Sequence, residues 1–260
     1  MRTLSEAVAA ALLVLATVSA ATLLYLWAAA ASQPQAGQAG LPALKIDAVE
    51  PVQGGGGGRC VYLRVYLRNA GAAPATVEGN RSGYLEGATV AVLRAAPLRS
   101  YRLSPGEEAQ LRLVPARRVE SPRLLRVVAA GGVEASATVS GCRVALLGVV
   151  HRHPPVDGSR EATVLPGGVR VETWVEYYAT DGSGLRLYRV WFNVTPPPGL
   201  VVRYARAEIL TASGGHPVWA ASPVAEYQGL RGPDWWAEYW APVREDEFPV
   251  TVVVSLDYGG

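Results

Sequence analysis

The sequence predicts a mainly β protein in which one N-terminal hydrophobic α-helix precedes two β-rich units. Residues 7–31 contain no charged side chain, whereas 28 glycines and 19 prolines punctuate the 260-residue chain. From residue 45 onward, apolar and polar side chains alternate in short runs, which is the pattern of half-buried strands. No convincing helical pattern follows residue 32. Half of the residues are hydrophobic, so the chain can form a substantial core.

The uncharged segment 7–31 has the length of a membrane span. As a helix it would extend roughly 37 Å at about 1.5 Å per residue, against a bilayer core of about 30 Å. Tyr25 and Trp27 stand near its far end, where aromatic side chains anchor a span at the interface. Arg2 is the only basic residue before it, so we expect the N-terminus in the cytoplasm and the remainder outside.

A cleaved secretory signal is the alternative for this segment. Small-residue cleavage sites could lie at Val18–Ala20 or within residues 28–31. Signal cores are usually about 7–15 residues long, and this segment is longer. The carboxylate of Glu6 is also unusual before a signal core. We therefore favour retention of residues 1–32 as a transmembrane and assembly helix.

Residues 2–27, RTLSEAVAAALLVLATVSAATLLYLW, resemble the N-termini of archaeal type IV pilin-like and archaellin-like subunits. The resemblance implies that a dedicated peptidase removes the short leader before Leu4. It also implies that the remaining helices bundle as the core of a filament, where Glu6 meets the free amine of a neighbouring subunit. Thr3 departs from the family, which more often has Gly or Ala at this position.

The same segment has a spacing that suits helix packing. Small residues recur four apart, which lets helix backbones approach closely. Glu6 has a second reading, as an acid stabilised by the helix dipole. The predicted assembly residues are Leu4, Glu6, Ala7, Ala11, Ala16 and Ala20, and the predicted partners are further copies of the chain, with the membrane before assembly.

Residues 33–43 read as a polar linker rich in Pro and Gly. Residues 44–142 form the first predicted β domain, in which CVYLRVYLRNAG is the clearest strand. Its residues Val61, Leu63, Val65 and Leu67 should face one side, and Tyr62, Arg64, Tyr66 and Arg68 the other. Further strands are expected at 88–94, 109–114, 124–129 and 133–139.

Residues 143–260 form the second predicted domain, with a hairpin that turns at 181–184. Short strands separated by regular turns favour a β-sandwich. We therefore expect two Ig-like, β-sandwich-type extracellular units.

Cys60 and Cys142 are the only cysteines, and they flank the first domain. In an exported chain an even cysteine count favours a disulfide. Buried unpaired thiols are the alternative.

The sequence contains no motif of a known catalytic site, and we expect neither an enzyme nor a cofactor. His151 and His153 would share one face of a strand and could hold a metal with Asp157. A plain strand end at the surface is the reading we favour, so no metal site is predicted. The formal net charge of +2, with no basic run, argues against a nucleic-acid partner.

Two further features suggest surface roles. Asn80 and Asn193 begin Asn-x-Ser/Thr sequons, which are possible glycan acceptors. Six of the seven tryptophans lie in the second domain, and the segment DWWAEYW contains the predicted contact residues Trp235, Trp236 and Trp240. Burial of these rings in the core is the alternative.

These features predict a structural subunit of an archaeal type IV pilus-like filament at the cell surface, with the helix in its core and the β domains outside. The alternative is a membrane-anchored surface protein that does not polymerise and whose second domain binds a glycan or a protein partner.

Overall fold

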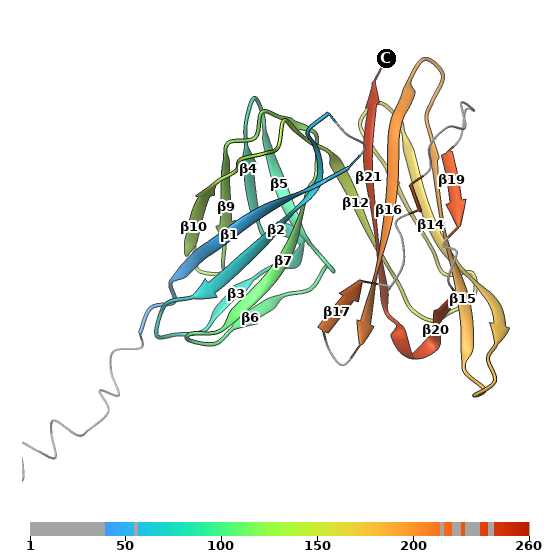
Figure 1. The fold of residues 1–260 in the computed structure, drawn as a ribbon, viewed down its shortest axis with the longest axis horizontal. Coiled ribbons are helices and arrows are strands. Elements are labelled where there is room, and N and C mark those ends of the chain that lie inside the picture. The colour runs from blue at the N-terminus through green and yellow to red at the C-terminus, as the bar shows by residue number, and fades with distance from the viewer. Residues whose placement is uncertain are drawn as a thin grey trace, which may run out of the picture. The chain divides into compact units, whose positions relative to one another are not determined.

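The structure is a computed structural model that describes residues 40–54, 57–213, 216–219, 225–226, 235–238 and 242–259. These residues form β-strands joined by turns (Figure 1). Their helical segments are two 3₁₀ turns, η1 (Gly79–Arg81) and η2 (Glu245–Glu247).

The predicted fold class therefore needs a correction. The chain is mainly β, as expected, but its described part contains no α-helix. Within the ranges given above, no helix has the length and hydropathy needed to span a bilayer. The helix predicted for residues 1–32 falls outside the described residues.

The first lobe is one nine-stranded sheet with a separate two-stranded ribbon. Its sheet has the order β10-β9-β4-β5-β7-β2-β11-β8, and β1 also pairs with β2. The ribbon is β3-β6. The strands are β1 (Leu44–Gln53), β2 (Arg59–Asn69), β3 (Ala75–Val77), β4 (Gly83–Glu86), β5 (Val90–Ala96), β6 (Tyr101–Leu103), β7 (Glu108–Pro115), β8 (Val119–Glu120), β9 (Leu124–Val128), β10 (Glu134–Thr138) and β11 (Val144–Ala145).

This sheet curls around a single core. Strand β1, which pairs with β2, lies beside β10 at one end of the strand order (Figure 1). Leu63, Val65 and Leu67 of β2 are fully buried inside, and the ribbon adds Val77 and Leu103. The first unit is therefore one continuous curled sheet rather than two stacked sheets, because hydrogen-bonded pairing runs unbroken from β10 to β2.

Asn69 anchors the start of β1 to this lobe. Its buried Nδ2 donates to the carbonyl oxygens of Ala73 (2.8 Å) and Leu103 (3.0 Å). Its Oδ1 accepts from the backbone amides of Gly71 (3.0 Å) and Ala43 (3.4 Å). Both ends of the buried amide are thus satisfied, as buried polar groups require.

The second lobe is a sandwich of two five-stranded sheets. One has the order β12-β21-β16-β17 with β18 paired to β16, and the other β13-β14-β15-β19 with β20 paired to β15. The strands are β12 (Leu147–His153), β13 (Arg160–Val164), β14 (Arg170–Thr180), β15 (Arg186–Thr195), β16 (Val201–Ser213), β17 (His216–Trp219), β18 (Ala225–Glu226), β19 (Trp235–Glu238), β20 (Val243–Arg244) and β21 (Val250–Gly259). Its core lies between the sheets.

Strands β16 and β21 are buried on both faces. One face contributes Ile209 and Val254 to the core of the second lobe. The other face contributes Tyr204, Leu210 and Val253 to a separate apolar cluster, which also contains residues of the first lobe. We call this cluster the seam; its buried members are Val61, Tyr62, Ala96, Val114, Leu146, Val150, Tyr204, Leu210 and Val253.

A β-bulge at Val61 joins the seam to the first lobe. In the β1–β2 ladder, Val52 pairs with Tyr62 and Gln53 pairs with Cys60, so Val61 is the extra residue. The predicted alternation therefore fails here, because Val61 enters the seam instead of sharing a face with Leu63. The Val61 carbonyl accepts a hydrogen bond of 3.2 Å from Ser255 Oγ of the second lobe.

Two buried carboxylates lie beside the seam, and one of them pairs across it. Asp257 of β21 is buried and lies 3.2 Å from the Arg118 Nη1 and 3.6 Å from the Arg59 Nε, both in the first lobe. Glu208 is buried beside Arg206, with Oε1 2.7 Å from Nη2. Burial raises the pKa of Glu208 to about 7, although neighbouring guanidinium groups oppose the shift.

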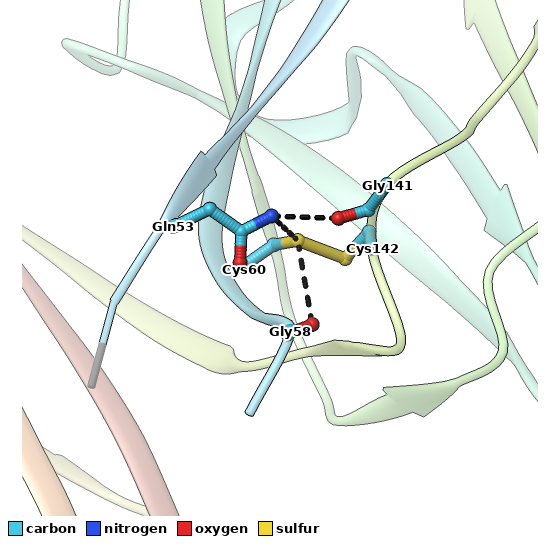
Figure 2. Close-up of a disulfide and its surroundings, with 5 residues drawn as sticks. All are labelled: Gln53, Gly58, Cys60, Gly141 and Cys142. Atoms are coloured by element: carbon cyan, nitrogen blue, oxygen red, sulfur yellow. Dashed lines mark hydrogen bonds between the residues drawn. A yellow bond between two sulfur atoms is a disulfide. The ribbon is translucent and has the colours of Figure 1, made fainter. Parts of the chain in front are cut away.

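The predicted disulfide between Cys60 and Cys142 is confirmed. Their Cα atoms are 5.8 Å apart, within the range that a disulfide requires. Figure 2 shows the Gln53 side chain beside the bond, where Nε2 donates to the carbonyl oxygen of Gly141 at 2.6 Å. The bond thus joins β2 to the segment before β11.

We expect the double variant Cys60→Ser/Cys142→Ser to unfold more easily than the wild type. The bond links residues 82 positions apart, and loss of a native disulfide typically costs about 2–5 kcal/mol. Denaturant titration of the variant, and of wild type treated with a reductant, should show the same lowered midpoint. Equal midpoints for the oxidised, reduced and variant proteins would contradict a stabilising role.

Candidate functional site

A buried polar network joins the two sheets of the second lobe. His151 and His153 of β12 are 3% and 0% exposed. The Oγ1 of Thr173 on β14 lies 2.8 Å from His151 Nδ1 and 2.7 Å from His153 Nε2. The outer nitrogens meet Thr163 Oγ1 (2.9 Å from His151 Nε2) and Ser159 Oγ (3.2 Å from His153 Nδ1).

The shared hydroxyl suits two neutral rings, and burial keeps them neutral. Thr173 has one hydroxyl hydrogen, so it donates to one ring and accepts from the N–H of the other. Each neutral ring then has one donor and one acceptor, and both find partners. Burial lowers the pKa of His151 and of His153 to about 4, and for His151 the neighbouring ring adds to the shift.

This network replaces the surface strand end that the sequence suggested for His151 and His153. Asp157, the third residue considered there, accepts a 2.8 Å hydrogen bond from the Tyr177 backbone amide. All four ring nitrogens have hydroxyl partners. Over the described ranges, no group of three or more His, Cys, Asp or Glu side chains is placed to hold a metal ion.

Aromatic and arginine side chains are layered on the outer face of the β13-β14-β15-β19 sheet. Trp174 lies opposite Trp191 in register, and their rings stack with centroids 5.8 Å apart and planes 4° apart. Arg160 Cζ lies 5.0 Å from the Trp174 ring centroid. Trp191 Nε1 donates to Glu176 Oε2 at 3.0 Å. We call this surface the aromatic face; it comprises Arg160, Trp174, Glu176, Tyr178, Arg189 and Trp191.

A second bulge exposes two tyrosines of β14, of which Tyr177 packs edge-on against the buried Tyr188 with ring centroids 6.2 Å apart. The β14–β15 register shifts between Tyr177 and Ala179. Tyr177 and Tyr178 are 44% and 49% exposed, and Arg189 Cζ lies 4.1 Å from the Tyr178 ring centroid. Tyrosine, tryptophan and arginine are enriched at protein interfaces, so the aromatic face is the best candidate contact surface on the described chain.

The structure places the predicted contact residues only in part. Trp235 and Trp236 belong to β19, where the backbone register sets them opposite Val194 and Asn193 of β15. Trp240 lies outside the described residues, so the predicted contact role of this segment stays a prediction.

The other predicted residues are widely separated. Asn80 lies on η1 in the first lobe, and Asn193 lies on β15 in the second. The predicted assembly residues, Leu4 to Ala20, lie outside the described residues.

Sequence reasoning missed the aromatic face, although a signal was present. Trp174 stands between Glu172 and Glu176 at a spacing of two, and Trp191 stands between Arg189 and Asn193. Since alternate residues of a strand share a face, these polar neighbours indicate that both rings lie on an outer surface.

Comparison with models of known protein families gives no match, and comparison with curated proteins gives no relative.

We expect the second lobe to lose stability as the pH falls from about 6.5 to about 4. The unfolded rings take up protons near their ordinary pKa of about 6.5, whereas the folded rings stay neutral to about 4. The unfolded state therefore binds more protons across this window, and stability falls with pH. The shift corresponds to on the order of 3 kcal/mol for each ring at pH 4. Denaturant titration at several pH values measures it.

The variant His151→Gln/His153→Gln provides the control. Glu208 titrates in both proteins and acts in the opposite sense, because its raised pKa adds stability as the pH falls through 7. The difference between the two pH profiles therefore isolates the histidines. Parallel profiles for the wild type and the variant would contradict the prediction.

Proposed function

We propose that the protein is an exported structural subunit of a cell-surface filament of the type IV pilus-like kind, with the two β lobes on its outside. The observation that carries the proposal is the Cys60–Cys142 disulfide, which closes the first lobe. Structural disulfides form and persist in oxidising, extracytoplasmic compartments.

The buried ionisable groups support a structural rather than a catalytic role. His151 and His153 are held by hydroxyl groups. Asp257 is paired with two arginines of the other lobe, and Glu208 with Arg206. Each of these side chains has a hydrogen-bond or ion-pair partner within the protein, which supports a structural role.

The seam supports a mechanical role. Residues Leu41–Gly260 form one compact unit, in which apolar packing and buried ions join the lobes. A subunit whose lobes are joined in this way would transmit force from one neighbour to the next. Asn69 ties the entry of the chain, at Ala43, into the same unit.

The filament part of the proposal comes from the resemblance of residues 2–27 to pilin-like subunits, and the proposed partners are further copies of the chain. Glu6 is the proposed docking charge, which meets the N-terminal amine of a neighbouring Leu4. An unpaired charge that is buried away from water is costly. Pairing of Glu6 with the neighbouring amine would therefore favour the one alignment of adjacent subunits in which both charges are paired.

We expect Glu6→Gln to lower filament yield strongly while the protein still folds and forms its disulfide. The substitution removes the docking charge and retains the shape of the side chain. Electron microscopy and immunoblotting of filaments sheared from cells measure the yield. Glu134→Gln, which removes an exposed charge from β10, is the matched control. Normal yield from the Glu6 variant would refute the docking role.

The aromatic face favours a second candidate, a surface protein that does not polymerise and binds a protein partner. Glycan-binding sites use open aromatic rings, whereas Trp174 is covered by Arg160 on one side and by Trp191. A protein partner can instead use ring edges and the exposed Tyr177 and Tyr178.

For this candidate we expect Tyr177→Ala/Tyr178→Ala to weaken binding of the purified protein to its own cell surface by about tenfold or more, as for interface hot spots. The rings are 44% and 49% exposed, but Tyr177 also contacts Tyr188 and Tyr178 lies beside Arg189, so binding is compared per folded molecule with the melting temperature measured in parallel. Val201→Ala, an exposed apolar position at 61%, is the control. Unchanged binding of the tyrosine variant would remove this candidate.

A further inference from the structure

We propose that copies of the chain stack head to tail, with a basic end of the first lobe of one copy against an acidic end of the second lobe of the next. The proposal rests on the filament proposed above and adds a contact that the outer lobes make within it. Both ends arise because the strand directions bring particular connections together.

One end of the first lobe gathers arginines. β1, β4, β7 and β10 run in one direction and β2, β5 and β9 in the other, so the connections that follow the first group meet at one end. The turn between β8 and β9 lies there too. We call this surface the basic end. Its connections, 54–58, 87–89, 116–118, 121–123 and 139–143, contain no carboxylate and include Arg117, Arg118, Arg123 and Arg143.

Backbone hydrogen bonds hold these connections together. The Arg143 amide donates to the Gly58 carbonyl oxygen, and the Arg143 carbonyl oxygen accepts from the Ser121 amide, both at 2.8 Å. The Arg123 amide donates to the Glu86 carbonyl oxygen, also at 2.8 Å. The arginines therefore stand on one ordered surface, although they are distant in sequence.

The protein itself neutralises part of this charge. Arg118 lies 3.2 Å from the carboxylate of Glu120 and 3.2 Å from that of Asp257. Arg123 and Arg143 are exposed, and they form no ion pair within the described part of the chain. The basic end therefore keeps positive charge that a second molecule can meet.

One end of the second lobe gathers carboxylates. The antiparallel pairs β12–β21, β13–β14 and β14–β15 bring the connections β12–β13, β14–β15 and β20–β21 to the same end. We call this surface the acidic end. Its connections, 154–159, 181–185 and 245–249, contain no basic residue and include Asp157, Asp181, Glu245, Asp246 and Glu247.

Arginines of the adjoining strands offset only part of this negative charge. Arg160 and Arg186 begin β13 and β15, and Arg244 ends β20. Arg244 pairs with Asp246 at 3.1 Å, whereas Arg160 lies over the Trp174 ring. The carboxylates of the acidic end are therefore in excess.

Strand β21 sets the two ends apart. η2 immediately precedes its first residues, and Asp257 near its other end pairs with Arg118 of the basic end. At about 3.3 Å per residue, this separation is roughly 30 Å. Figure 1 shows the C-terminal end of β21 and the turn between β14 and β15 at opposite ends of the second lobe. Complementary charges at opposite ends favour a contact between two different surfaces, and such contacts build open helical filaments when they do not close into a ring.

Charge reversal in the full-length protein, expressed in its natural source, tests this contact. Arg123→Glu/Arg143→Glu at the basic end and Glu245→Arg/Asp246→Arg at the acidic end should each lower filament yield about tenfold or more, because like charges then face each other. The four substitutions in one chain exchange the signs of the two ends, so the yield should return to within about twofold of the wild-type value. Electron microscopy and immunoblotting of sheared filaments measure the yield per folded, disulfide-bonded subunit.

Arg81→Glu/Arg102→Glu is the matched control. It makes the same change of charge at exposed positions on η1 and β6, away from the basic end, and should leave the yield unchanged. Normal yield from either reversal at the ends, or no recovery in the fourfold variant, would overturn the proposal. A loss confined to the basic-end variant would indicate an anionic partner other than a second copy, and would overturn it as well.

The same preparations separate this proposal from the proposed function. Wild-type protein that is recovered in filaments, with a yield insensitive to the reversals, overturns the contact between the ends alone. Wild-type protein that is absent from surface filaments overturns the proposed function and the contact together.

Discussion

The extra residue at Val61 is the constraint on which the rest of the molecule depends. A regular β2 would place Cys60 on the same face as Tyr62, away from the core that contains Cys142. The bulge lets Cys60 turn inward to the disulfide while Val61 and Tyr62 both enter the seam. A bulge leaves backbone groups without hydrogen-bond partners in the ladder. Here the carbonyl oxygen of Val61 is such a group, and it accepts a hydrogen bond from Ser255 Oγ of the other lobe.

The glycine that follows β1 accommodates this arrangement. A Cβ on Gly54 would lie 2.4 Å from Val61 Cγ1 and 2.7 Å from Tyr204 Oη, so a larger side chain there would push the lobes apart. The apolar packing of the seam thus also depends on small local features such as this glycine. Polar contacts such as the Asp257 ion pairs fix its geometry, because a buried charge is tolerated only near its partners.

Alternation predicted most strands, since half-buried strands show it directly. β5, β7, β9 and β10 lie within two residues of the expected segments. The seam was not predictable in this way, because β21 is buried on both faces and reads as a continuous apolar run. The burial of His151 and His153 depends on Thr163 and Thr173 from other strands, which no local pattern reveals. The Cys60–Cys142 disulfide could be predicted from the cysteine count. The bulge at Val61 that permits it could not be predicted from the sequence pattern.

The position of β21 in its sheet determines which lobe can fold first. β21 lies between β12 and β16, so the sheet that faces the seam cannot form until Val250–Gly259 has emerged. The first lobe contains every residue of its own core by Ala145, and domains fold from the N-terminal side during synthesis. Until then the second lobe cannot cover Tyr62 and Val114, which are buried at the seam in the complete fold. The newly made chain is therefore expected to be most prone to aggregation after the first lobe folds and before the last strand has been made.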